Sequence, residues 1–110
     1  VESIPATEFS GRFKKGGLNV MDVRKPGEFS AEHVEDAMTN PLDFISQSMD
    51  KVDQETEYHV YCAGGYRSMI ACSILKSRGY HQVVDVQGGF AAISKTDIPT
   101  TDYVCPSTLK

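Results

Sequence analysis

The sequence has few of the features that mark membrane, nucleic-acid-binding or disulfide-rich proteins. It contains no tryptophan, and no apolar run approaches the ~20 residues that a membrane-spanning helix requires. A formal net charge of −4 argues against nucleic acid as a partner and leaves no polybasic signal for a membrane surface. The three cysteines lie far apart, and their odd number does not suggest a disulfide framework. We therefore expect a globular protein of the reducing cytoplasm, with neither membrane nor nucleic acid as a partner.

Metal-binding patterns are also missing. The sequence has no Cys-x-x-Cys pair and its three histidines are scattered, so we expect no zinc site and no other metal. With 110 residues, 40% of them hydrophobic and 24% charged, the chain has the size and composition of one globular domain, which we assign to residues 1–110. Because the chain begins at Val1 rather than methionine, we expect it to be processed or cut from something longer.

Apolar stretches alternate with helical patterns along the chain, which predicts an α/β fold with a mainly parallel sheet. Strands are expected at 18–23, 37–39, 57–61 and 83–86. Helices are expected at 7–13, after a turn that begins at Lys25-Pro26, at 42–49, at 66–78 and after 88–89. In open α/β sheets, ligands bind beyond the carboxyl ends of the strands. Cys62 directly follows the strand at 57–61 and so belongs to that edge.

The segment Tyr61-Cys62-Ala63-Gly64-Gly65-Tyr66-Arg67-Ser68 is the most informative in the chain. Its two glycines admit backbone conformations that a side chain would forbid, so several N–H groups can point at one spot. That spot lies at the positive end of the following helix, which favours an anion and the thiolate form of a cysteine. The loop predicts a nucleophilic sulfur, Cys62, in an anion-binding cradle closed by Arg67. The structural alternative is a buried cysteine in a glycine-rich turn.

Cys62-Ala63-Gly64-Gly65-Tyr66-Arg67-Ser68 resembles the active-site loop of the rhodanese family of sulfurtransferases, and other landmarks follow in the family's order. They are Asp22-Val23-Arg24-Lys25-Pro26-Gly27-Glu28-Phe29, His33-Val34-Glu35-Asp36-Ala37 with Asn40-Pro41, and Val84-Asp85-Val86-Gln87-Gly88-Gly89-Phe90. The chain departs from the pattern at Glu32, at Glu35-Asp36 and at Ala91, where the family usually has glycine, Pro-Gly and tryptophan. The resemblance implies a rhodanese-like α/β fold, with about five strands in a mainly parallel central sheet and helices on both faces.

The resemblance also implies roles for individual residues. Cys62 would be the nucleophile and Arg67 the catalytic anion clamp, while Ala63, Gly64, Gly65, Tyr66, Arg67 and Ser68 would bind the substrate. Ser68 would donate to the bound sulfur or cap the helix. Asp22 and Arg24 would be framework residues behind the pocket. From the residues themselves we also expect Arg24 to pair with Glu28, an interaction worth at most about 1 kcal/mol if the pair is exposed. Cys72 is interpreted as a packed residue, Cys105 as a free thiol in an irregular tail, and His33 as a structural histidine.

The implied activity is transfer of a sulfane sulfur from thiosulfate, or a related small anion, to a thiol or cyanide through a Cys62 persulfide, without a cofactor. One alternative is a persulfide carrier or partner-binding module of a larger protein. The tail at 100–106 resembles the end of rhodanese modules fused behind metallo-β-lactamase-like domains, so such a domain is a further expected partner. A second alternative is a cysteine-dependent phosphatase. It is less favoured because those enzymes place five residues between cysteine and arginine, and here four intervene.

Overall fold

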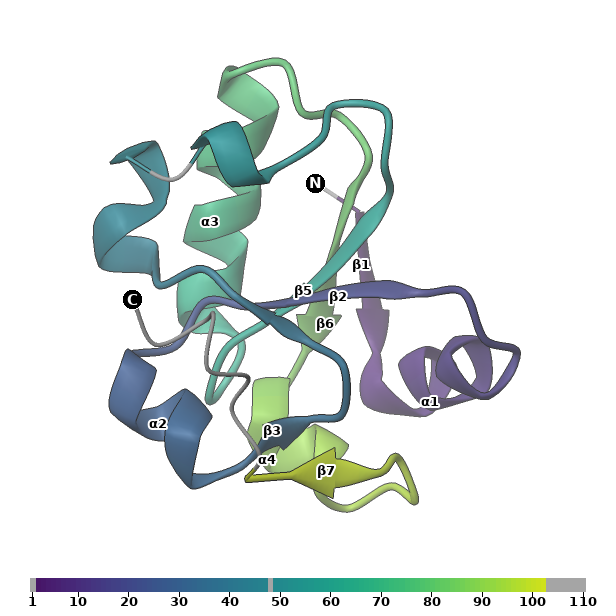
Figure 1. The fold of residues 1–110 in the computed structure, drawn as a ribbon. Coiled ribbons are helices and arrows are strands. Elements are labelled where there is room, and N and C mark those ends of the chain that lie inside the picture. The colour runs from purple at the N-terminus through teal and green to yellow at the C-terminus, as the bar shows by residue number, and fades with distance from the viewer. Residues whose placement is uncertain (1, 48, 103–110) are drawn as a thin grey trace.

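The computed structural model describes residues 2–47 and 49–102. A parallel sheet of five strands forms its centre, in the order β1-β6-β5-β2-β4 (Figure 1). The strands are β1 (Glu2–Pro5), β6 (Val83–Gln87), β5 (Tyr58–Tyr61), β2 (Asn19–Asp22) and β4 (Met38–Thr39). The predicted α/β class, with about five mainly parallel strands flanked by helices, is confirmed.

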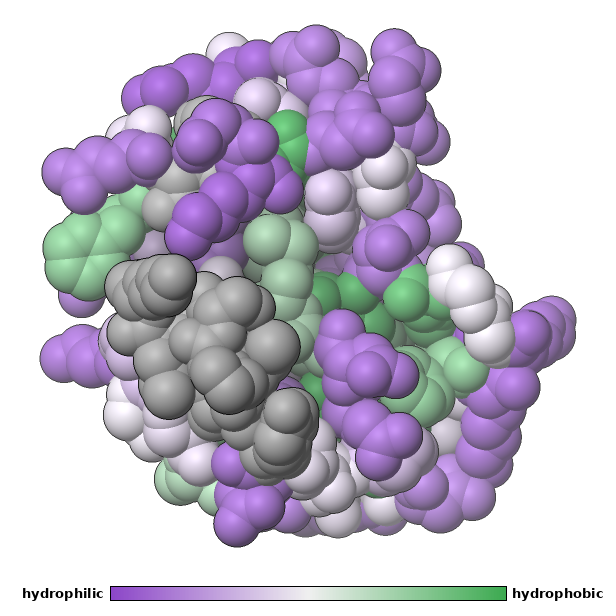
Figure 2. Space-filling view, viewed as in Figure 1, coloured by the Kyte–Doolittle hydropathy of each residue, from purple (hydrophilic) through white to green (hydrophobic). Residues whose placement is uncertain are grey.

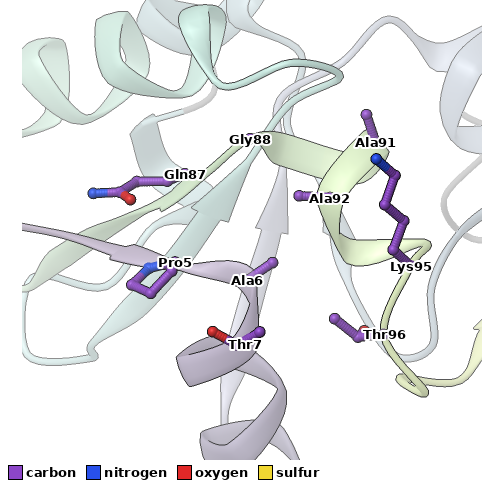
Figure 3. A pocket seen from close by; sticks show the side chains of 9 residues that line it. All are labelled: Pro5, Ala6, Thr7, Gln87, Gly88, Ala91, Ala92, Lys95 and Thr96. Carbon is purple, nitrogen blue, oxygen red and sulfur yellow. The ribbon is translucent and has the colours of Figure 1, made fainter.

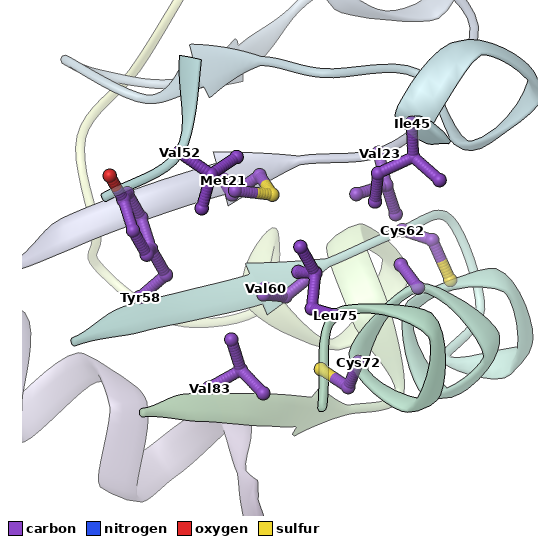
Figure 4. Close-up of a cluster of buried hydrophobic side chains, with 11 residues drawn as sticks. Met21, Val23, Ile45, Val52, Tyr58, Val60, Cys62, Cys72, Leu75 and Val83 are labelled. Carbon is purple, nitrogen blue, oxygen red and sulfur yellow. The ribbon is translucent and has the colours of Figure 1, made fainter. Parts of the chain in front are cut away.

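One face of the sheet is covered by α3 (Tyr66–Ser77) and the 3-10 helix η1 (Leu42–Gln47). The side chains buried between them form a first cluster around Met21, Val60 and Leu75, which Figure 4 shows together with Cys62 at the end of β5. Successive side chains of a strand point to opposite faces. β5 is buried at all four positions, as expected of a central parallel strand with a helical layer on each side.

The opposite face is covered by α1 (Ala6–Lys14) and α4 (Gly89–Ile93). Phe9, Val84, Val86 and Ile93 are buried in the second cluster on this side. Tyr61 also belongs to this cluster, whereas Cys62 belongs to the first one. The two side chains at the end of β5 therefore point to opposite faces of the sheet. The end of β5 is thereby fixed from both sides, and the loop that follows it starts from a rigid support.

Some elements depart from the predicted ones. β1 was not predicted, and β3 (His33–Val34) pairs antiparallel with β7 (Thr100–Thr101) in a small second sheet. The segment with helical spacing at 42–49 forms η1 and a second 3-10 helix, η2 (Met49–Lys51), in place of one α-helix. The short helix expected after the turn at Lys25-Pro26 is confirmed as α2 (Pro26–Ala31).

The surface in view in Figure 2 is largely hydrophilic, with hydrophobic side chains gathered toward the middle of that face. In the part of the chain that the structure describes, no helix is both long enough and apolar enough to cross a bilayer.

Candidate active site

Cys62 lies in the loop between β5 and α3, at the carboxyl edge of the sheet, and is only 1% exposed. The backbone N–H of Gly65 donates a hydrogen bond to the Cys62 Sγ, with a nitrogen–sulfur distance of 3.1 Å. Gly65 has φ +101°, a conformation that favours glycine, and it immediately precedes the first turn of α3. The loop therefore turns a backbone donor toward the sulfur at the positive end of a 12-residue helix.

The start of α4 holds the carbonyl groups of this loop. The N–H of Phe90 donates to the carbonyl of Cys62 at 2.6 Å, and the N–H of Ala91 donates to the carbonyl of Ala63 at 3.0 Å. Gly89, with φ +58°, packs so closely that a Cβ there would collide with the Cys62 carbonyl. These contacts fix the orientation of the loop peptides.

Arg67 is paired with Glu28 on α2. Its Nη1 and Nη2 donate to the two carboxylate oxygens of Glu28 at 2.8 and 3.1 Å. The hydrogen bonds from Arg67 lower the pKa of Glu28 to about 2, although burial opposes the shift. Glu28 also accepts the backbone N–H of Lys25 at the start of α2. The predicted pairing of Arg24 with Glu28 is wrong, because both carboxylate oxygens of Glu28 accept hydrogen bonds from the guanidinium group of Arg67.

Arg24 instead pairs with Asp22 in a buried ion pair. The Asp22 carboxylate, which is fully buried, accepts the Arg24 Nη2 at 2.9 Å, its Nε and its backbone N–H. The second bond of Arg24 Nη2 goes to the carbonyl of Glu32, and the guanidinium lies 4.5 Å from the centroid of the Phe90 ring. The pair thus ties the end of β2 to the segment after α2 and to α4. It makes no hydrogen bond to Cys62.

Ser68 lies beneath Cys62 and is fully buried. Its Oγ is 3.6 Å from the Cys62 Sγ and 3.3 Å from the carbonyl of Gly65, and it is hydrogen-bonded to the carboxyl group of Asp85. Gly65, and not Ser68, occupies the N-cap position of α3. No role was predicted for Asp85. A carboxylate between valines, as in the strand Val83-Val84-Asp85-Val86, is unusual in a buried strand and could have marked Asp85 as a candidate from the sequence.

The other predicted binding residues form the rim of the site. Gly64 is exposed, and a Cβ there would meet open space. Tyr66 is 77% exposed. A small cavity of about 30 Å³ lies beside Arg67 and is also lined by Lys25 and Asp43. Lys25 and Asp43 therefore bring charges of opposite sign to the neighbourhood of Arg67.

The remaining cysteines and histidines differ from Cys62 in their surroundings. Burial raises the pKa of the Cys72 thiol to about 12, which makes it a poor nucleophile. His33 is hydrogen-bonded to the carbonyl of Phe29 at 2.7 Å and stacks on that ring, as expected of a structural histidine. His59 is buried against Phe9 on the other face of the sheet. Cys105 and the rest of the tail after Asp102 lie outside the described residues.

An open hollow elsewhere on the molecule lies between the start of α1 and α4, with Pro5, Thr7, Gln87 and Lys95 among its lining residues (Figure 3). Its lining holds none of the residues 62–68 and contains no thiol, imidazole or carboxylate, so it has no part in a site built on Cys62. Within residues 2–47 and 49–102, no three His, Cys, Asp or Glu side chains gather as a metal ion would need.

Comparison with known proteins agrees with this geometry. A sulfurtransferase of Allochromatium vinosum is 30% identical over 80 residues, which are 73% of this chain and 75% of that protein. The Bacillus subtilis protein YrkF, provisionally named a sulfur carrier protein, is 28% identical over 66% of this chain and 39% of its own length. A rhodanese-related protein of Thermoplasma volcanium superimposes with a TM-score of 0.84 at 26% identity, covering 94% of this chain and all of that one. Residues 5–96 match the rhodanese-like domain, and the chain belongs to that family.

Proposed function

We propose that the protein is a sulfurtransferase that takes a sulfane sulfur from thiosulfate or a related anion through a persulfide on Cys62. The observation that carries the proposal is the hydrogen bond from the Gly65 N–H to the Cys62 Sγ, at the start of α3 and beside Arg67. Family membership and a sulfurtransferase relative support sulfur transfer as the class of reaction. Thiosulfate as donor is our own inference from the resemblance of the loop 62–68 to the rhodanese active site and from the guanidinium of Arg67.

The proposed first step is attack by the Cys62 thiolate on the outer sulfur of thiosulfate. A sulfur–sulfur bond forms to Cys62 as the bond to the central sulfur breaks, and sulfite leaves with the bonding electron pair. The charge is −3 on both sides, because the thiolate and thiosulfate become a persulfide anion and sulfite. The Gly65 N–H stabilises the anionic sulfur, and Arg67 attracts the sulfonate oxygens.

In the second step a thiol, from a small molecule or a protein, or cyanide takes the outer sulfur and returns Cys62 to the thiolate. No cofactor takes part in this cycle. A reducing compartment such as the cytoplasm would keep the two described cysteines, Cys62 and Cys72, as the free thiols they are in the structure.

A second proposal concerns the larger setting of the domain. The chain spans 39% of YrkF, so comparable domains occur within longer proteins. A carrier role, in which Cys62 holds sulfur for a neighbouring domain, uses the same chemistry. A metallo-β-lactamase-like domain is the neighbour we propose, because the tail at 100–106 resembles the end of modules fused to such domains.

Mass spectrometry after treatment with thiosulfate tests the proposal. We expect the peptide that contains Cys62 to gain one sulfur atom, the Cys72→Ser variant to gain it equally, and the Cys62→Ser variant to gain none. Treatment with an aryl phosphate tests the phosphatase alternative, and no phosphorylated Cys62 is expected. Added sulfur on Cys72 or Cys105, or full loading of Cys62→Ser, would contradict the proposal.

A further inference from the structure

A chain of three polar side chains runs from the nucleophilic sulfur into the protein interior. The Cys62 Sγ contacts the Ser68 Oγ at 3.6 Å, and the same Oγ is hydrogen-bonded to Asp85 on β6. Ser68 is fully buried and Asp85 is 2% exposed. Among the described residues, no salt bridge joins Asp85 to a lysine, arginine or histidine.

A buried carboxylate without a cation is unfavourable, and it relieves this by binding a proton. Burial accordingly raises the pKa of Asp85, while the hydrogen bond with Ser68 opposes the shift. Ser68 and Cys72 of α3 are the groups near Asp85, and the Cys62 thiol is linked to it through Ser68. Its register neighbours, Val60 on β5 and Ser3 on β1, do not titrate near neutral pH. Asp85 is therefore placed to hold a proton that is shared with Cys62.

The single hydroxyl proton of Ser68 links the two ends of this chain. In the arrangement of the structure, the Cys62 S–H donates to Ser68 and the Ser68 O–H donates to Asp85. In the reversed arrangement, the Asp85 carboxylic acid donates to Ser68, and Ser68 donates to a Cys62 thiolate. The first becomes the second when the S–H proton moves to the Ser68 oxygen and the Ser68 proton moves to Asp85. One negative charge is present in both arrangements.

We propose that Asp85 is a positioning residue that accepts the proton of the Cys62 thiol through Ser68. The thiolate then forms without releasing a proton to water, and the Ser68 hydroxyl is turned to donate to the sulfur. This inference rests on the proposed function, since it assigns the source of the attacking thiolate. During sulfur loading Asp85 keeps the proton, and the proton can return to Cys62 once an acceptor has removed the outer sulfur.

The shared proton has a distinctive signature in the pH dependence of cysteine reactivity. When two coupled groups hold one proton between them, the fraction of molecules with the proton on one of them does not depend on pH. Alkylation of Cys62 by iodoacetamide should therefore rise at acidic pH as the first proton leaves the pair. It should then stay level, and rise again as the second proton leaves. An isolated thiol gives a single rise.

The experiment measures the alkylation rate of Cys62 from pH 4 to 10 in a Cys105→Ser background. We expect the alkylation rate of the unsubstituted protein to rise in two separate steps as the pH increases, and that of Asp85→Asn and of Ser68→Ala to rise in one step. Near pH 6 the rate should be lower in these variants by about tenfold or more. Asp97→Asn removes an exposed carboxylate that pairs with Lys14, and should keep both rises. Circular dichroism checks that each variant folds.

A single rise in the unsubstituted protein overturns the inference, whether or not the variants fold. So does a curve for Asp85→Asn that keeps both rises. Loading with thiosulfate, followed by mass spectrometry in the same samples, separates this inference from the proposed function. Sulfur on Cys62 with a single rise leaves the sulfurtransferase proposal standing without the proton relay. Two rises without sulfur on Cys62 leave the relay standing and contradict thiosulfate as donor.

Discussion

Arg67 and Glu28 form a bidentate ion pair beside the loop that holds Cys62, with nitrogen–oxygen distances of 2.8 and 3.1 Å. The pair joins the first turn of α3 to α2, and both side chains are about one-third exposed. The arginine proposed to hold the anionic donor is thus occupied by a carboxylate of the same chain. A donor such as thiosulfate must compete with Glu28 for this guanidinium or share it.

The first prediction concerns this competition. In Glu28→Gln the negative charge beside Arg67 is removed while the size of the side chain is kept. We expect KM for thiosulfate to fall by about 1.4- to fivefold, because a partly exposed ion pair is worth about 0.2–1 kcal/mol. Steady-state kinetics gives the ratio, with Glu57→Gln as the control for an exposed carboxylate far from the loop. An increase in KM would mean that Glu28 orients Arg67 for the donor and does not compete with it.

The second prediction is the pH dependence of stability that this pair confers. The pKa of Glu28 is lowered in the folded protein to about 2 from its ordinary value of 4.5. Its contribution is therefore present above about pH 4.5 and is lost as the pH falls toward 2. We expect the free energy of unfolding in urea to differ between the unsubstituted protein and Glu28→Gln by at most about 1 kcal/mol at pH 7. That difference should shrink below pH 4.5, and a difference that grows with acid would contradict the assignment.

The fold could be predicted because its main elements carry strong local patterns. β5 and β6 are short runs rich in valine and tyrosine, buried at every position except Gln87, and α3 has apolar residues at helical spacing followed by Gly79. β1 was not predicted because Ile4 is its only buried residue, so its sequence shows no alternation. β3 and β7 have two residues each and depend on a pairing between segments more than 60 residues apart, which no local pattern reveals.

The candidate residues of the loop come from the sequence, whereas the pairings between side chains come only from the structure. The glycines and Arg67 of the loop follow from a contiguous motif, whereas Glu28 and Asp85 approach the loop from α2 and β6. Which carboxylate meets which arginine depends on tertiary placement. Arg24, only four residues before Glu28 in sequence, is instead held by Asp22, because the Asp22 carboxylate meets both the backbone and the side chain of Arg24.

The third prediction concerns the support of the loop by α4. A methyl group at Gly89 would collide with the Cys62 carbonyl, and φ of +58° is unfavourable for alanine. We expect Gly89→Ala to lower stability by about 1–3 kcal/mol and to reduce sulfur loading of Cys62. Thermal unfolding measures the first effect, at roughly 4–8 °C per kcal/mol. Gly64→Ala is the matched control, since its Cβ meets open space, and a similar loss of stability there would contradict the explanation.

The fourth prediction concerns the buried ion pair behind the site. In Asp22→Ala the guanidinium of Arg24, which is only 6% exposed, loses its counter-charge. We expect a loss of about 3–5 kcal/mol in the free energy of unfolding, because an uncompensated charge remains in the interior. Urea unfolding measures it, with Asp102→Ala as an exposed control. A loss below 1 kcal/mol would show that Arg24 escapes to water or that the carboxylate contributes little.

The last prediction separates the charge of Arg67 from its geometry. Arg67→Lys keeps the positive charge but loses the planar fork that contacts two oxygens at once. If the arginine holds the sulfonate oxygens of the donor, kcat/KM for thiosulfate should fall by an amount equivalent to about 1.5–3 kcal/mol, the range of a charge-assisted hydrogen bond.

Sulfur transfer from an uncharged organic polysulfide should suffer less from this substitution, since that donor presents no sulfonate oxygens. Steady-state kinetics with both donors compares the two losses, and Arg78→Lys is the control for an exposed arginine at the far end of α3. Equal losses with the two donors would assign Arg67 to stabilising the anionic sulfur of Cys62 itself. No loss with either donor would show that the ion pair with Glu28 is the only task of this arginine.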